Sequence, residues 1–271
     1  MAESLSQSEL IKKQYRDSTN LRARGDLHQQ FGTNKHGWFD WVFDRIVVPN
    51  NGRILEVGCG HGLLWQKCIA RVDPAWTIVL SDLSAGMLDE ACHALDKLNA
   101  TGFKFEIIDA QNIPLEDNTY DTVIANHCLY HVPDRPRAIS ELQRVLKPGG
   151  RLLATTVGEG HMAEIRDLIY QFDPRLLEQD KNVQTGFTLQ TGKSELDALF
   201  DTVHLEQYNN SLVITEINPL IEYVCSYVNM DIMSPQLDRL HSFLSNEFQQ
   251  MNGEFPITTQ SGMFVATKAK S

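Results

Sequence analysis

Short apolar runs alternate with segments of helical periodicity through the middle of the chain. The apolar runs predict strands near residues 54–57, 76–82, 103–108, 121–125 and 151–156. Helical spacing predicts helices over 63–70 and 84–98, with Ser84 as a candidate N-cap, and a third helix that opens at Asp134 and Pro136 and stops at 147–150. Strands that alternate with helices form parallel sheets with right-handed crossovers. The pattern therefore predicts an α/β fold whose ligand lies at the carboxyl ends of the strands.

The two flanks of this alternating region are less regular. Residues 8–30 are mostly polar and predict a helix laid over the edge of the domain, and residues 31–47 are rich in aromatic side chains. After Gly158, periodicity predicts helices near 162–172, 196–200, 219–228 and 235–251, with strands at 202–208 and 261–268. We interpret the extra helices as a lid. We expect one domain, made of a helical arm (1–50), a core (51–156) and the lid with the remaining strands (157–271).

Composition and charge narrow the classes of partner. A chain of 271 residues with 42% hydrophobic residues can bury a full core. Its 24 basic and 35 acidic residues give a net charge of -11, which disfavours nucleic acid and anionic membranes as partners and favours a small or cationic substrate. No secretory signal or run of transmembrane length is visible, and five widely spaced cysteines without a C-x-x-C pair indicate reduced thiols. We expect a cytoplasmic monomer or homodimer.

Residues 53–62 combine a strand with a glycine-rich turn. Gly58, Gly60 and Gly62 follow the apolar run as E-x-G-x-G-x-G, and such glycines let the backbone turn sharply and approach a ligand closely. A nucleotide-like cofactor is the first expectation. The dinucleotide fingerprint places glycine or alanine three residues after its second glycine, whereas this chain has Leu63 there. A nicotinamide cofactor is therefore the weaker alternative.

Glu56 and the three glycines resemble motif I of the class I S-adenosylmethionine-dependent methyltransferases, a family with a seven-stranded, Rossmann-like fold. Further motifs of the family have counterparts in the expected order, at 82–88, 109–114, 121–127 and 146–151. The chain looks most similar to the small-molecule branch that includes ubiquinone and menaquinone biosynthesis. The resemblance implies a doubly wound, mostly parallel sheet with helices on both faces and an antiparallel last strand. It also implies methyl transfer from S-adenosylmethionine to a small-molecule acceptor, with S-adenosylhomocysteine as the product.

The resemblance assigns contacts to the cofactor as well. Glu56 would face its ammonium group, Asp82 would accept hydrogen bonds from its ribose hydroxyls, and the carbonyl of Asn126 would hold the ammonium from the other side. The other implied contacts are with Gly58, Cys59, Gly60 and Gly62 in the turn, Leu83, Met87, Asp109 and Ala110 around the adenine, and Tyr15 from an amino-terminal helix. A single acidic residue at a strand end can also be a helix cap. The assignment of these residues to cofactor binding therefore depends on the whole set of motifs.

Residues 126–131, directly after the fourth predicted strand, are where this family places acceptor-side residues. His127 and His131 are candidate catalytic bases, because an unperturbed imidazole titrates near pH ~6.5, and Tyr130 is a candidate acceptor contact. The two histidines form an H-x-x-x-H pair, but it leaves a strand and has no third ligand nearby, so we expect no metal. Further pocket candidates, each of which also fits ordinary packing or surface exposure, are His36, Trp38, Trp41, His161 and Met162.

Two alternatives to a methyltransferase stay open. One is a nicotinamide-dependent oxidoreductase, and the other is a non-catalytic sensor or partner protein that binds S-adenosylmethionine. The sequence does not identify the methyl acceptor, because the aromatic segment and the lid carry no readable motif and a fold does not supply a substrate.

Overall fold

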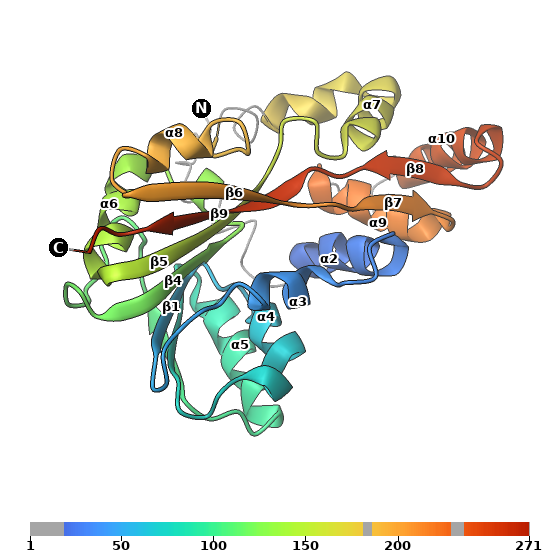
Figure 1. Ribbon diagram of the computed structural model, residues 1–271. Helices are drawn as coiled ribbons and strands as arrows, with labels where there is room; N and C mark the ends of the chain where they lie inside the picture. The colour runs from blue at the N-terminus through green and yellow to red at the C-terminus, as the bar shows by residue number, and fades with distance from the viewer. Residues whose placement is uncertain (1–18, 181–185, 229–235, 271) are drawn as a thin grey trace, which may run out of the picture.

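Seven strands form the main sheet of the computed structural model, which describes residues 19–180, 186–228 and 236–270 (Figure 1). Their order is β3-β2-β1-β4-β5-β9-β6. Neighbours from β3 to β5 pair in parallel, whereas β9 pairs antiparallel with both β5 and β6. The predicted fold class is therefore confirmed. The strand bounds are β1 Arg53–Val57, β2 Thr77–Asp82, β3 Phe103–Ile107, β4 Tyr120–Asn126, β5 Leu146–Val157, β6 Thr202–Tyr208 and β9 Ser261–Thr267.

Helices cover both faces of this sheet because apolar side chains alternate along its strands. Ile54 faces a cluster with α3, α4 and α5, whereas Leu55 faces a cluster with α6 and α8. Two of these helices have the side-chain caps that the sequence predicts: Ser84 accepts from the Met87 amide, and Asp134 accepts from the Arg137 amide. The helix bounds are α3 Trp38–Phe43, α4 Leu63–Cys68, α5 Ala85–Lys97, α6 Arg135–Val145 and α8 Gly192–Leu196, with 3₁₀ turns at Ile69–Arg71 and Leu129–His131.

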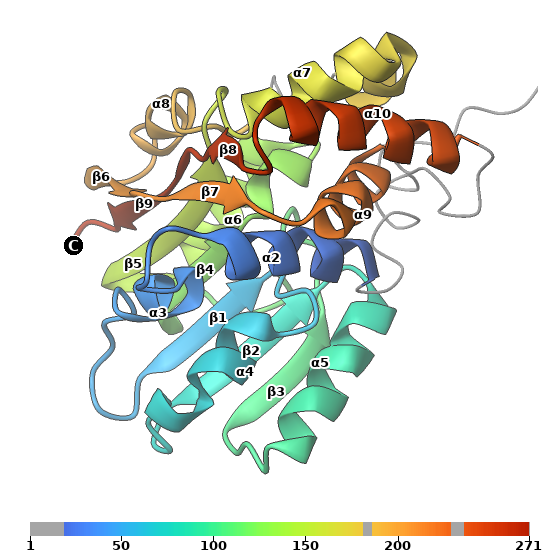
Figure 2. The ribbon, with the colours of Figure 1, turned by 90° about the vertical axis from the view of Figure 1, so that its right-hand side faces the viewer.

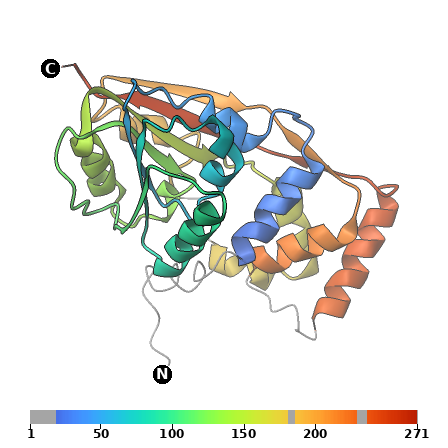
Figure 3. The same cartoon turned by 90° about the horizontal axis from the view of Figure 1, so that it is seen from below.

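A third apolar cluster lies outside the main sheet, beyond the carboxyl ends of its parallel strands (Figure 2). It joins α2 from the amino-terminal flank to elements that follow β5. In Figure 3, α2 (blue) lies beside α9 (orange), in agreement with their contacts. The elements of this layer are α2 Thr19–Phe31, α7 Ala163–Phe172, a 3₁₀ segment Pro174–Asp180, α9 Ile217–Tyr227, α10 Leu237–Gln250, β7 Ser211–Ile214 and β8 Phe255–Thr258.

A two-stranded ribbon links the third cluster to the main sheet. Tyr208, the last residue of β6, pairs with Ser261, the first residue of β9. Ser211, the first residue of β7, pairs with Thr258, the last residue of β8. The ribbon therefore runs from the sheet into the helical layer (Figure 1). Gly32, directly after α2, makes a further bridge to Leu212 of β7.

Three expectations about individual elements need correction. The helix predicted at 196–200 ends at Leu196, and Leu199 is 39% exposed, so only part of that apolar set faces the core. Residues 147–150 belong to β5, which begins at Leu146 directly after α6. The ribbon strands β7 and β8 were not expected. Among the described residues, no helix has both the length and the apolar character needed to cross a membrane.

Candidate functional site

The turn after β1 needs glycine for two physical reasons. Gly58, Gly60 and Gly62 have φ values of +65°, +55° and +75°, in the left-handed region that side chains disfavour. A Cβ on Gly58 would lie 2.6 Å from the Cβ of Cys128, which follows β4. The backbone amide of Cys59 donates to the carbonyl of Ser81 at 2.9 Å, so the turn is fixed against β2.

Glu56 lies buried at the base of this turn. Its carboxylate accepts a hydrogen bond from the indole N–H of Trp65 at 2.5 Å. Burial is the main cause that raises the pKa of Glu56 to about 7, and the nearby charge of Asp82 acts in the same direction. A cation placed next to Glu56 would stabilise its charged form.

Asp82, the last residue of β2, accepts hydrogen bonds from both the glycine turn after β1 and the loop after β2. One carboxylate oxygen accepts from the amide of Gly60 at 2.9 Å, and the other accepts from the amide of Ser84 at 2.8 Å. Burial raises the pKa of Asp82, although these amides oppose the shift. Beside it, Met87 is buried and Leu83 is 37% exposed, so an apolar surface remains open next to an acid.

Asp109 lies just after the end of β3, and Asn126 is the last residue of β4. Asp109 accepts from the amide of Gln111 at 2.9 Å, and Ala110 lies between them, half-buried. The side-chain oxygen of Asn126 accepts from the hydroxyl of Thr155 at 2.6 Å. Because Val57 pairs with Ser81 and Ala125, and Asp82 pairs with Ile107, these polar residues lie along one edge of the sheet.

Aromatic side chains gather around His127, directly after β4. His127 has φ +52°, and its ring centroid lies 5.0 Å from that of Trp38 and 6.3 Å from that of Tyr130. Tyr130 in turn contacts His131 at 4.5 Å. Burial lowers the pKa of both His127 and His131 to about 4, so both rings are neutral at pH 7.

His161 and Met162 belong to the turn between β5 and α7. Nδ1 of His161 accepts from the backbone amide of Gln260 at 3.1 Å, and its ring stacks on His28 of α2 with centroids 5.6 Å apart. Met162 is buried, and its sulfur accepts from the hydroxyl of Tyr223 at 3.1 Å. A small cavity of about 70 Å³ lies beside both residues, with Thr188 and Tyr227 also in its wall.

Of the other predicted pocket residues, Trp41 stacks on Trp38 of the aromatic cluster with ring centroids 5.2 Å apart, His36 lies apart from that cluster, and Tyr15 cannot be described. His36 is exposed and pairs with Asp44 at 2.8 Å. Trp41 is buried, packs against Tyr208 at 5.3 Å and carries the guanidinium of Arg45 over its ring at 3.8 Å. Tyr15 lies outside the described residues.

Sequence reasoning missed one histidine near the site, His28, and left the role of another, His61 in the glycine turn, open. His28 comes from a polar helix with no motif, and only the tertiary fold brings it to His161. His61, whose role the motif left open, is buried, and its Nδ1 has no hydrogen-bond partner within the part of the chain that the structure describes. The described residues contain no group of three or more side chains that could hold a metal ion.

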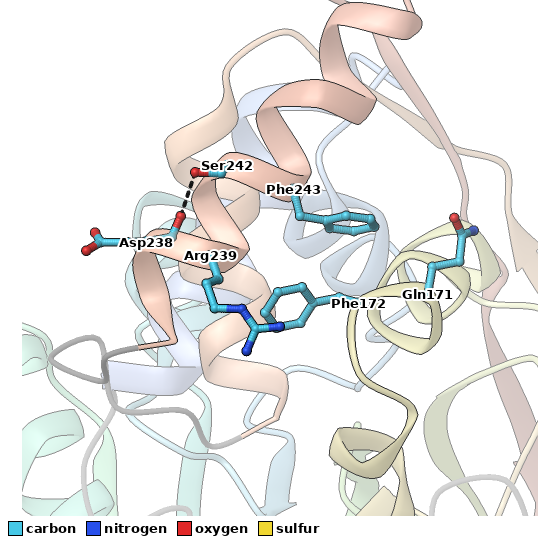
Figure 4. A pocket seen from close by; sticks show the side chains of 6 residues that line it. All are labelled: Gln171, Phe172, Asp238, Arg239, Ser242 and Phe243. Atoms are coloured by element: carbon cyan, nitrogen blue, oxygen red, sulfur yellow. Dashed lines mark hydrogen bonds between the residues drawn. The ribbon is translucent and has the colours of Figure 1, made fainter.

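The larger hollow on the surface does not belong to this site. A groove of about 460 Å³ lies between α7 and α10, where Phe172 and Phe243 lie next to Arg239 (Figure 4). The guanidinium of Arg239 lies 5.8 Å from the centre of the Phe172 ring. None of the residues that line the groove is a predicted site residue.

Comparisons with known proteins agree with this geometry. Residues 55–154 match the family described as a methyltransferase domain. The ubiquinone/menaquinone biosynthesis C-methyltransferase of Hahella chejuensis is 34% identical over 117 residues, which are 43% of this chain and 47% of that protein. Methyltransferase GfsG of Streptomyces halstedii is 30% identical over 137 residues, 48% of this chain and 47% of that protein. The chain spans about half the length of these curated relatives.

Solved structures share the fold. One is phosphoethanolamine N-methyltransferase 2 of Haemonchus contortus, whose structure was determined in complex with S-adenosylmethionine. The two structures superpose with a TM-score of 0.63 at 19% sequence identity, and the match covers 98% of this chain and 61% of that chain. The cyclase SpnF has a TM-score of 0.61 at 18% identity and covers 97% of both chains. At these identities the likeness concerns the fold alone. The family match, the motif order and the seven-stranded sheet together identify residues 55–154 as a methyltransferase domain of the class I, S-adenosylmethionine-dependent type.

Proposed function

We propose that this chain transfers a methyl group from S-adenosylmethionine to a small-molecule acceptor. One observation carries the proposal: the buried carboxyl group of Glu56 and the half-buried carboxylate of Asp82 flank a glycine turn within the methyltransferase domain. S-Adenosylmethionine carries an ammonium and a sulfonium group, and cations stabilise carboxylates of raised pKa. The sulfonium supplies an activated methyl group, so the protein has mainly to align the acceptor and exclude water.

The residues of the sheet edge fit the cofactor in the roles implied by the family. Asp82 would hold the ribose hydroxyls, since each carboxylate oxygen keeps accepting capacity beside its amide partner. Glu56 and the carbonyl of Asn126 would hold the ammonium group. The remaining proposed contacts are Gly58, Cys59, Gly60 and Gly62 with the aminoacyl and ribose parts, and Leu83, Met87, Asp109 and Ala110 with the adenine. Tyr15 stays a prediction.

On the acceptor side, His127 and His131 are the proposed catalytic candidates. Both are neutral at pH 7 because burial lowers their pKa values to about 4. Trp38, Tyr130, His161 and Met162 are the proposed acceptor contacts, whereas the surface ion pair of His36 and the packing of Trp41 favour structural roles for those two residues. The free thiols of all five cysteines support a cytoplasmic location.

Thermal unfolding with ligand tests the proposal. At a 100-fold excess over Kd, S-adenosylmethionine and S-adenosylhomocysteine should each stabilise the protein by about 2.7 kcal/mol. Asp82→Asn should remove most of that gain, whereas Asp167→Asn, an exposed carboxylate on α7, should keep it. Absence of a shift with either ligand would contradict the proposal, and a shift with NADH alone would favour the oxidoreductase.

A second candidate is a protein of this family that binds the cofactor without transferring its methyl group. The fold likeness to a cyclase over 97% of both chains supports this alternative. Labelled S-adenosylmethionine separates the two candidates. Binding without label transfer to any member of a panel of phenols, amines, thiols and carbon acids would favour the non-transferring protein.

A further inference from the structure

The peptide unit between Asn126 and His127 lies where β4 ends, beside the glycine turn. In the sheet, β4 runs between β1 and β5, and its last pair with β1 joins Ala125 to Val57. Asn126 still pairs with Thr155 of β5. His127 then leaves the strand with φ +52°, in the left-handed region that a residue with a side chain rarely adopts. This peptide unit therefore needs support from outside the regular ladder.

The hydroxyl group of Thr155 supplies this support. Thr155 is fully buried, and its Oγ1 accepts a hydrogen bond from the backbone amide of His127 at 2.9 Å. The same hydroxyl donates its proton to the side-chain oxygen of Asn126 at 2.6 Å. A threonine hydroxyl has one proton to donate and can accept at the same time, so both functions are used here. One side chain of β5 thus holds the backbone and a side chain at the end of β4.

The hydrogen bond from the His127 amide also sets the direction of the Asn126 carbonyl. The peptide bond between the two residues is trans, and in a planar trans unit the N–H and C=O groups point in opposite directions. The N–H group of this unit points toward β5, because it donates to Thr155. The carbonyl of Asn126 therefore points toward the opposite neighbour of β4, which is β1. That strand ends at Val57 and leads directly into the glycine turn.

We propose, resting on the methyl transfer proposed above, that Thr155 is a positioning residue for S-adenosylmethionine, which directs the carbonyl of Asn126 at the ammonium group of the cofactor. A carbonyl oxygen has two lone pairs, and an ammonium group has only N–H donors to offer. Glu56, buried at the base of the glycine turn, supplies the second contact to the ammonium group. Thr155 acts only through the peptide unit that it holds.

The burial of Thr155 favours a role in the site over simple packing. Valine has nearly the same shape and suits a strand equally well, and it buries no polar atom. Residues 152–154, which precede Thr155 in β5, are all apolar and buried. The next residue, Thr156, is also buried, but its hydroxyl donates to the carbonyl of Phe187, away from this peptide unit. The hydroxyl at position 155 is therefore explained by the two groups that it holds at the cofactor edge of the sheet.

A pair of matched ligands tests this role. S-Adenosylhomocysteine and its deamino analogue, which carries hydrogen in place of the amino group, would be titrated into the full chain by calorimetry. In Thr155→Val the amide of His127 loses its acceptor, so the Kd for S-adenosylhomocysteine should rise about tenfold. The Kd for the deamino analogue should change less than about twofold, because that ligand has no ammonium group to position. An equal change for both ligands, or no change for either, would overturn the assignment.

Further variants separate positioning from folding. Thr155→Ser keeps the hydroxyl and should bind both ligands within about twofold of the wild type. Thr122→Val is the matched control, because Thr122 is a fully buried threonine of β4 whose hydroxyl donates to the carbonyl of Val47 at 3.2 Å. It should lower stability without changing the ratio of the two Kd values, and a changed ratio in either variant would contradict the positioning role. If Thr155→Val does not fold, Thr155→Cys serves in the same comparison, since a thiol is a weaker hydrogen-bond partner than a hydroxyl.

The outcomes also distinguish this inference from the proposed function. If the wild type binds S-adenosylhomocysteine and its deamino analogue equally well, the inference fails and the methyltransferase proposal stands. If S-adenosylhomocysteine does not bind, the proposed function fails first. Carbon-13 in the backbone carbonyl of asparagine gives a direct readout: the Asn126 signal should shift when S-adenosylhomocysteine binds to the wild type, and should shift less in Thr155→Val. An identical shift in the two proteins would refute the role of Thr155.

Discussion

At the scale of single residues, Glu56 is a motif residue whose pKa is raised by its burial in the fold. Its place in the sequence motif predicts contact with a cationic group, but its burial and its bond to Trp65 follow only from the tertiary fold. The same holds for His28, because a lone histidine in a polar helix gives no indication of the ring it will contact. Motif residues could be predicted from sequence, and their protonation states could not.

The raised pKa of Glu56 predicts a pH-dependent stability. The pKa of Glu56 rises from 4.5 to about 7 on folding, so the folded state binds more protons than the unfolded state between these pH values. The contribution of Glu56 to the free energy of unfolding therefore decreases as the pH rises from 4.5 to 7. The loss should reach about 3 kcal/mol above pH 7 in the cofactor-free protein. Urea denaturation of Glu56→Gln should lack this loss, whereas Glu254→Gln, an exposed control, should behave as the wild type.

The left-handed turn at Gly58 predicts a second effect. Gly58→Ala should cost about 2–4 kcal/mol, because the new Cβ combines a positive φ with contact to Cys128 at 2.6 Å. Adding Cys128→Gly should recover the part of the lost stability that comes from the steric contact. If the effects of the two substitutions on the free energy of unfolding simply add in a double-mutant cycle, the proposed contact is contradicted. Gly25→Ala in α2, where a Cβ meets nothing within 4 Å, should instead be neutral or slightly stabilising.

At the scale of elements, local pattern was a good guide wherever an element is long or strongly apolar. The strand predicted at 202–208 has those bounds in the structure, and α5 and α6 begin at their predicted caps. The four-residue strands β7 and β8 have no comparable signal, and about 40 residues separate them, so their pairing depends on the helical layer around them. The polar helix α2 was predicted, but its attachment to α9 was not.

The packing of α2 predicts the outcome of core truncation. Leu27 is 1% exposed within the third cluster, so Leu27→Ala should lower the free energy of unfolding by about 2–5 kcal/mol. Gln30→Ala, on the exposed face of the same helix, should change it little. Equal unfolding midpoints for the two variants would show that α2 is not held by this contact.

At the scale of the whole molecule, two apolar clusters cover the sheet and a third supports the helical layer. The mostly parallel sheet with an antiparallel last strand was expected from the family resemblance. The third cluster was not, because its residues come from both flanks of the chain and no local pattern joins them. Separate clusters predict that parts of the molecule open independently.

Hydrogen exchange tests this independence. Leu244→Ala removes a side chain of the third cluster and should lower amide protection mainly in α7, α9 and α10. Leu142→Ala, in a cluster on the sheet, should lower protection in β4 and β5 at least as strongly. Uniform loss of protection in both variants would indicate a single cooperative unit.

The position of β9 bears on how the protein forms during synthesis. β9 pairs with both β5 and β6, yet it follows β6 by about 50 residues. While a nascent chain emerges, the edge of β5 therefore has no neighbour, and β6 has no strand to pair with, until Ser261–Thr267 arrives. Open strand edges invite pairing between chains, so the ribosome-bound intermediate should be the stage at which this protein most needs a chaperone.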